Sequence, residues 1–311
     1  MSTNTPTAAI AEKTLQVIQD NDFLQLTSSK DKYPNSKGSG LPLIHVQTTL
    51  CNAVIALQGA QLLEFSTITG QPLLWLSPNC NFTQGVALRG GIPVCLPWFG
   101  VNAQDPKKQK HGFARNETWQ LQGATLLADG AAELIFSFVS TANALFEFNF
   151  TSELKMTLGN SAKLELKVTN TGANSFDCSW ALHNYHPVRS LSDVRVKGLA
   201  GKMYLDNLQN YADKFQAEDV NFPSEVDRVF YNIDNSLTIS GSPNISITHH
   251  NCPSVIVWNP GANAATIADI GAGNEQGYIC VERGAVLNEK WNLAAGESQS
   301  AWMKFEAAKS V

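Results

Sequence analysis

The sequence has few charged residues and no excess of positive ones. Charged side chains make up 16% of its 311 residues, below the ~25% of typical soluble domains, which argues against intrinsic disorder. The 22 Lys and Arg are outnumbered by 27 Asp and Glu, which gives a net charge of −5. Because nucleic acids and anionic membranes are bound through basic surfaces, this composition argues against both as partners.

Long apolar runs and a secretion leader are also missing. No apolar run approaches the ~20 residues of a membrane span. The first residues, MSTNTPTAAIAEK, carry neither the basic nor the apolar stretch of a signal peptide. We therefore expect a globular, cytoplasmic protein.

The six cysteines lack the spacing of a disulfide framework. They form no CxxC motif and no close pair, and stand at Cys51, Cys80, Cys95, Cys178, Cys252 and Cys280. Scattered cysteines in a chain of this length are typical of buried thiols in a reducing compartment.

One early segment has the periodicity of a helix. Ile10, Leu15 and Ile18 fall near helical spacing within residues 8–20. The polar stretch at residues 28–40, SSKDKYPNSKGSG, is rich in Gly, Pro and Ser and predicts a loop. The chain is therefore expected to open with a helix followed by a loop.

Beyond this point, apolar and polar residues alternate as in half-buried strands. Residues 146–158 and 164–168 alternate on either side of a GNSA turn, which predicts a long hairpin. Residues 237–247 predict a second hairpin, and a last strand is expected near residues 301–305. Such strands imply large antiparallel sheets that face each other in a sandwich.

No linker or change in composition divides the chain after residue 41. The predicted fold class is all-β, an antiparallel sandwich with minor helix. We expect an N-terminal helix-and-loop extension, residues 1–40, followed by a single β-sandwich domain, residues 41–311.

Five segments interrupt the alternation and gather reactive side chains with glycine and proline. We expect them to form loops at one end of the sandwich, where sites tend to be built. They span residues 88–100, 111–119, 182–188, 225–231 and 280–284.

Arg89 and Arg115 stand in two of these segments, among aromatic residues and few other charges. Arg89 precedes two glycines, which allow close backbone approach and leave the guanidinium free to reach a ligand. Two such arginines suggest a planar clamp for a phosphate or a carboxylate. The alternative is that each arginine pairs with an Asp or Glu and holds its loop in place.

Three other side chains have both a structural and a functional interpretation. His183 has an apolar context, Ser-Trp-Ala-Leu-His, where a histidine is either a hydrogen-bonded core residue or functional. Glu282 ends an apolar run, and it must be paired or functional because burying an unpaired carboxylate is costly. Asp227 stands beside Arg228, so the two can also form a simple surface ion pair.

Motifs for metals, nucleotides and a serine nucleophile are missing. His183 and His186 are three residues apart and His249 and His250 are adjacent, but no thiol or carboxylate at ligand spacing completes a zinc set. The sequence has no GxGxxG, GxxxxGKS/T or GxSxG motif. We therefore expect neither a metal nor another cofactor.

Eight motifs occur in order between residues 41 and 305: PLLWLSP, RGGIPVCLPWFG, HGFARN, LHNY, VRVKGLAGKMYLD, VDRVFY, VIVWNP and ICVERG. RGGIP followed by HGFARN is the most specific combination. Together they resemble the glucose-6-phosphate 1-epimerase branch of the aldose 1-epimerase (galactose mutarotase-like) superfamily. The resemblance implies a supersandwich of antiparallel sheets with the site in a sugar-sized groove.

Carried over by position, the resemblance also implies an acid–base pair. His183 in LHNY matches the general acid, and Glu282 in CVERG matches the general base. Two ligands for a phosphate and two for sugar hydroxyls are implied as well, namely Arg89 with Arg115 and His111 with Asp227.

The implied activity is the interconversion of the α and β anomers of a hexose 6-phosphate by ring opening and reclosure. The carboxylate takes the proton of the C1 hydroxyl while the histidine protonates the ring oxygen, and the roles then reverse. This chemistry needs no metal, nucleotide or redox step. The expected partner is the small-molecule sugar phosphate alone, bound by a monomer.

Three positions depart from the family pattern and leave the substrate open. Lys110 precedes HGFAR where the family usually has Gln, His186 follows LHNY, and Gly261 follows WNP where the family commonly has Trp and then Lys. A mutarotase for unphosphorylated aldoses and a non-catalytic carbohydrate-binding sandwich are alternatives. A glycoside hydrolase that uses Asp227 and Glu282 as its carboxylate pair is a further one.

Overall fold

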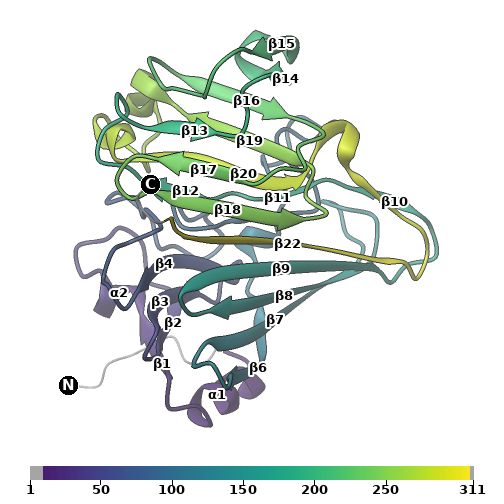
Figure 1. Cartoon of the computed structure of the whole chain (residues 1–311). Helices are drawn as coiled ribbons and strands as arrows, with labels where there is room; N and C mark the ends of the chain where they lie inside the picture. The colour runs from purple at the N-terminus through teal and green to yellow at the C-terminus, as the bar shows by residue number, and fades with distance from the viewer. Residues whose placement is uncertain (1–9, 309–311) are drawn as a thin grey trace.

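The computed structural model describes residues 10–308, which fold mainly into antiparallel β-sheets (Figure 1). Within this range the strands form two sheets of eight, one of four and one of two. No helix in the same range is long and apolar enough to cross a membrane. The predicted all-β class with minor helix is confirmed.

The four-stranded sheet holds the N-terminal part of the chain. Its order is β1 (Leu24–Ser28), β2 (Pro42–Gln47), β3 (Cys51–Ala56) and β4 (Gln61–Thr67). Because β1 pairs with β2, this sheet spans residue 41. The predicted early helix is confirmed as α1 (Glu12–Gln19), although residues 8 and 9 lie outside the described range.

Residues 28–40 were predicted to form a loop, and this prediction is only partly confirmed. The stretch contains the short helix α2 (Ser29–Lys32). The Ser28 side chain accepts a hydrogen bond from the backbone N–H of Asp31, which satisfies one of the free donors at the start of the helix. This local cap explains a helical turn in a polar, glycine-rich segment.

One eight-stranded sheet, called here the β9 sheet, has one apolar face. Its order is β13 (Arg195–Lys197), β17 (Leu237–Ser240), β18 (Ile245–His250), β22 (Ser298–Ala307), β9 (Ser161–Asn170), β8 (Phe150–Leu158), β7 (Ala132–Ser140) and β6 (Gln120–Leu126). Every second side chain of β8 is buried, as alternation predicts. Both predicted hairpins and the last strand are confirmed, except that the strand expected from Phe146 begins at Phe150.

The second eight-stranded sheet, the β20 sheet, is buried more completely. Its path is β15 (Ala212–Gln216), β14 (Lys202–Asp206), β16 (Val226–Phe230), β19 (Ser254–Asn259), β20 (Tyr278–Ala285), β11 (Trp180–Leu182) and β5 (Val94–Cys95), and β12 (Tyr185–Pro187) also pairs with β20. A small sheet joins β10 (Phe176–Cys178) to β21 (Trp291–Leu293). All eight residues of β20 are buried.

The two faces of β20 have different surroundings. Val281 joins the apolar cluster that also contains Leu166 of β9, so this face packs on the main core between the large sheets. Successive side chains of a strand point to opposite faces. Cys280 and Glu282 therefore point away from that core, and it is on this second face that the reactive side chains gather.

All six cysteines are buried free thiols, as predicted.

Candidate active site

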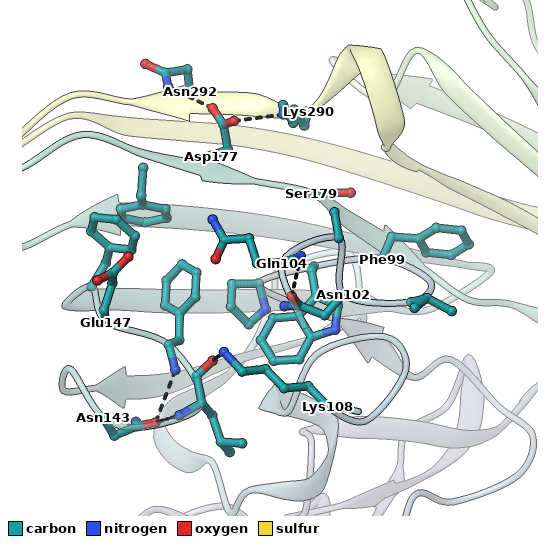
Figure 2. Close-up of a pocket in the computed structure, with 18 of the residues that line it drawn as sticks. Phe99, Asn102, Gln104, Lys108, Asn143, Glu147, Asp177, Ser179, Lys290 and Asn292 are labelled. Carbon is teal, nitrogen blue, oxygen red and sulfur yellow. Dashed lines mark hydrogen bonds and ion pairs between the residues drawn. The ribbon is translucent and has the colours of Figure 1, made fainter. Parts of the chain in front are cut away.

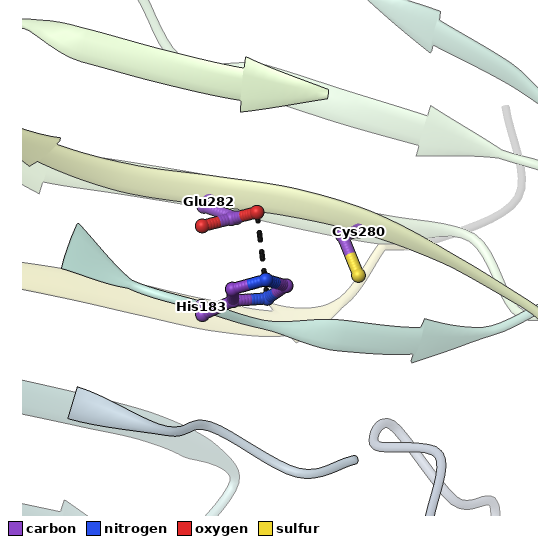
Figure 3. A group of neighbouring side chains, drawn as sticks. All are labelled: His183, Cys280 and Glu282. Atoms are coloured by element: carbon purple, nitrogen blue, oxygen red, sulfur yellow. Dashed lines mark ion pairs between the residues drawn. The ribbon is translucent and has the colours of Figure 1, made fainter. Parts of the chain in front are cut away.

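Strand register brings His183 and Glu282 together. Leu182 is paired with Arg283 and Tyr185 with Cys280, which sets the intervening His183 opposite Glu282. His183 Nδ1 lies 3.4 Å from Glu282 Oε1 (Figure 3). Both residues are buried, with side-chain exposures of 8% and 1%. The pair is thus held by the backbone of the β20 sheet rather than by a flexible loop.

Burial sets the protonation of this pair. It holds the pKa of Glu282 well above its usual value, and nearby Asp227 adds to the rise while Arg115 opposes it. Burial also lowers the pKa of His183 well below its usual value, and His111 and Arg115 add to this effect. The neutral forms of both groups are therefore favoured, a protonated carboxyl group on Glu282 and an uncharged imidazole on His183.

Asp227 and Cys280 lie on the same face through the register of β16, β19 and β20. Asp227 is paired with Trp258, and Trp258 is paired with Cys280, so the three form one row across the sheet. Asp227 accepts a hydrogen bond from the Asn207 side chain. Its pKa is raised, chiefly by burial, although the hydrogen bond from Asn207 acts in the opposite direction.

The surface ion pair considered for Asp227 and Arg228 is not formed. The two residues are adjacent in β16 and so point to opposite faces. Arg228 instead donates to Gln216 Oε1 at 2.6 Å and lies over the ring of Tyr204.

Arg89 is paired with a carboxylate, which was one of its two interpretations. Its Nε lies 3.1 Å from Asp269 Oδ2, and its Nη1 donates to the Tyr185 hydroxyl at 2.9 Å. A quarter of the Arg89 side chain stays exposed. Its charge is thus largely offset by Asp269.

Arg115 differs from Arg89 in lacking such a partner. It forms no ion pair with a carboxylate anywhere in residues 10–308. Its Nη2 donates to the backbone oxygen of Lys110 at 2.8 Å, while its Nε is buried without a hydrogen-bond partner. Arg115 therefore keeps both charge and donors for an anionic ligand.

Aromatic and imidazole rings surround His183. The His111 ring lies 5.7 Å from the His183 ring, and burial lowers the pKa of His111 well below its usual value. Tyr185 stacks on His183 with ring centroids 4.8 Å apart. Trp258 stands edge-on at 6.0 Å and is only partly buried. These rings form a cluster that is partly open to solvent at His111 and Trp258 and closed at Tyr185.

One expectation about these segments is wrong. Residues 225–231 and 280–284 are not loops but contain strand β16 and most of β20, and β12 lies within 182–188. His186 lies apart from His183, because its ring contacts Phe305 and its Nδ1 lies 3.0 Å from the Leu73 backbone oxygen.

Four side chains of the site were not singled out from the sequence: Tyr185, Trp258, Asp269 and Cys280. Three of them stand inside recognisable motifs, LHNY, VIVWNP and ICVERG. Asp269 stands in none, and only the fold brings it to Arg89. The motifs were therefore better guides to the site than the chemistry of single residues.

A separate cavity of about 700 Å³ lies near this site (Figure 2). Figure 2 shows Phe99, Asn102 and Lys108 on its wall, together with side chains from several other segments. It is lined by none of the six predicted site residues. The Phe99 ring also packs edge-on against His111 at 4.8 Å, so one aromatic residue separates the two regions.

Comparisons with known proteins cover about three quarters or more of the chain. The family model described as aldose 1-epimerase matches residues 42–306. Two relatives are both named "Putative glucose-6-phosphate 1-epimerase". The one from Salmonella typhimurium is 33% identical over 249 residues, covering 78% of this chain and 82% of the relative. The one from Cenchrus ciliaris is 32% identical over 252 residues, covering 76% and 75%.

A solved structure agrees with these matches. The crystal structure of "a putative mutarotase (YeaD)" from Salmonella typhimurium superposes with a TM-score of 0.79 at 29% identity, covering 87% of this chain and 91% of that one. A structure from Escherichia coli K12 has a TM-score of 0.68 at 15% identity, which supports the fold alone. Fold, motifs and family match agree, and the chain belongs to the aldose 1-epimerase family.

Proposed function

We propose that this protein interconverts the α and β anomers of a hexose 6-phosphate, glucose 6-phosphate foremost. The observation that carries the proposal is the contact between His183 and Glu282, a buried acid–base pair on one face of a rigid sheet. A binding module needs no such pair. The names of the relatives about a third identical to this chain support the phosphorylated substrate.

The proton held by the pair accounts for the chemistry. In the reactive form, Glu282 is a carboxylate and His183 an imidazolium, which has the same number of protons as the neutral pair favoured by burial. Glu282 takes the proton of the C1 hydroxyl while His183 protonates the ring oxygen, and the bond between C1 and that oxygen breaks. The open-chain aldehyde turns about the C1–C2 bond. Reversal of the same transfers closes the ring as the other anomer.

The two arginines make unequal contributions to phosphate binding. Arg115 has no carboxylate partner and a buried Nε without a hydrogen bond, so it is the stronger candidate for the phosphate. The charge of Arg89 is offset by Asp269, so Arg89 contributes less than Arg115. With a net charge of −5, the protein depends on this local positive charge to attract an anionic sugar.

The test is the rate of anomer exchange measured by NMR. Freshly dissolved α-glucose 6-phosphate, glucose and galactose are each followed toward anomeric equilibrium with and without the protein. We expect acceleration of the phosphorylated sugar and little effect on the free sugars. Arg115→Gln should remove most of this preference, with Arg228→Gln as the matched control because Arg228 faces away from the site. No acceleration of any sugar contradicts the proposal.

A second candidate is a mutarotase for unphosphorylated aldoses. The ion pair between Arg89 and Asp269 favours it, because one of the two expected phosphate ligands already has a carboxylate partner. In that case glucose or galactose is accelerated at least as strongly as glucose 6-phosphate, and Arg115→Gln changes little.

A further inference from the structure

We propose that His183, Cys280 and Glu282 form a three-donor site for a zinc-like divalent cation, and that a cation bound there blocks the acid–base pair. Their donor atoms all lie within 4.8 Å of one another (Figure 3). No zinc spacing is visible in the sequence, because the donors come from two segments that only the sheet brings together. The inhibition, although not the binding, rests on the function proposed above.

The spacing of the donor atoms suits tetrahedral coordination. Zinc bonds are about 2.3 Å long to sulfur and about 2.0–2.2 Å long to nitrogen or oxygen, so neighbouring donors stand about 3.3–3.6 Å apart. His183 Nδ1 and Glu282 Oε1 are 3.4 Å apart, within that interval. The pairs that involve the Cys280 sulfur lie within 4.8 Å, and cation binding draws them into the same interval.

Two polar atoms of the cluster have unused bonding capacity. His183 Nδ1 and Glu282 Oε2 are buried and have no hydrogen-bond partner. An unpartnered buried polar atom is costly, and coordination of a cation satisfies the two residues together. The sugar uses the same two residues during catalysis. A cation and the sugar therefore compete for them.

The thiol is the feature that catalysis does not explain. Anomer exchange uses an acid and a base and leaves Cys280 without a role. Zinc, in contrast, is bound preferentially by thiolate and imidazole, with carboxylate as a further ligand. When a cation binds, the thiol and the carboxyl group each lose a proton, and the two negative charges that result offset those of the divalent cation.

The backbone holds these three donors in place before any cation binds. Cys280 and Glu282 are two residues apart in β20 and so point to one face, and His183 lies opposite Glu282. Strand β20 has β19 on one side and β11 with β12 on the other. A preorganised set of three protein ligands leaves a fourth position for water, as in open zinc sites.

Binding is tested directly by titrating the full-length protein with Cd²⁺, a zinc-like probe whose thiolate bond gives an ultraviolet charge-transfer band. We expect one Cd²⁺ per chain in the wild type and in Cys95→Ser, whose thiol is buried in strand β5 but lies outside the donor set. The band should disappear in Cys280→Ser, and the affinity should fall in His183→Ala. No band in the wild type, or an unchanged band in Cys280→Ser, overturns the site.

Inhibition is tested separately on the same proteins. Zn²⁺ should slow anomer exchange in competition with the sugar, and a chelator should restore the rate. Cys280→Ser should need at least about 10-fold more Zn²⁺, since even the loss of an outer partner of a metal ligand costs about 10–100-fold in affinity. Equal inhibition of wild type and Cys280→Ser overturns inhibition through this site.

The two proposals can fail separately. If the protein accelerates anomer exchange of no sugar, the proposed function fails, while the Cd²⁺ titration still decides the metal site. If Cys280→Ser does not fold, His183→Ala decides it.

Discussion

The two large sheets of this protein use their faces differently. In the β9 sheet, one face is buried and the other meets solvent, so charged and apolar side chains alternate along β8 and β9. In the β20 sheet, strand β20 is buried on both faces and carries an apolar run interrupted by Glu282 and Arg283. The polar side chains of β8 and β9 therefore lie mostly on the solvent face of the β9 sheet. Strand β20 of the other sheet instead buries its polar side chains, including Glu282 of the candidate active site.

The largest effect is expected from removing the buried acid–base pair. Glu282→Gln and His183→Asn should each lower turnover by roughly 10²–10⁴-fold, the usual contribution of general acid–base catalysis, while the fold is kept. The measurement is NMR anomer exchange, with circular dichroism to check folding. Glu165→Gln is the matched control, since Glu165 lies on the β9 sheet and pairs with Lys163. Wild-type turnover in either site variant refutes the assigned roles.

The contrast between the sheets also explains how much of the fold and of the candidate site could be predicted from the sequence. The hairpin of β8 and β9 was predicted because solvent on one face imposes a period of two on the residues. β20 was mistaken for a loop because a strand covered on both faces has no such period. β16 was mistaken for a loop because the charged pair Asp227 and Arg228 interrupts the alternation of its five residues. The motifs still located His183 and Glu282. The pairing of Arg89 with Asp269 depends on a contact 180 residues apart in sequence, which no local pattern reveals.

The β9 sheet should show the complementary behaviour, with a large loss of stability and little effect on chemistry. Leu166 is fully buried in β9, within the core between the sheets. Leu166→Ala should lower the free energy of unfolding by about 2–5 kcal/mol through lost burial and a cavity, as measured by urea denaturation. Lys167→Ala is the control at an exposed neighbour and should change stability by less than about 0.5 kcal/mol. Turnover per folded molecule should stay near wild type, and a collapse of turnover in folded Leu166→Ala contradicts the division of roles.

Between the sheets, His186 should make stability depend on pH. Burial lowers its pKa to about 4, against 6.5 for the ordinary side chain, and its ring packs on Phe305 of β22. Below pH ~6.5 His186 becomes protonated in the unfolded chain, whereas in the folded protein it stays neutral down to about pH 4. The free energy of unfolding therefore falls as the pH drops through this window. The loss amounts to on the order of 3 kcal/mol. Urea unfolding at several pH values should show this slope in the wild type and a flatter one in His186→Gln. Parallel slopes contradict the assignment.

The smallest change in stability is expected at Glu165 in the β9 sheet. Its sign should be opposite to that of the change at Glu282 in the β20 sheet. Glu165 lies 3.1 Å from Lys163 and 3.6 Å from Lys155 on the half-exposed face of β9. Glu165→Gln should lower the free energy of unfolding by less than about 1 kcal/mol, and salt should reduce the difference.

Glu282→Gln should instead raise the free energy of unfolding at neutral pH. Because the pKa of Glu282 is raised in the folded state, ionisation favours the unfolded chain as the pH rises above ~4.5, the ordinary value. Glutamine has no such ionisation, so the gain should shrink toward pH 4.5, and a Glu282→Gln protein less stable than wild type at neutral pH would show that the carboxyl group stabilises the fold.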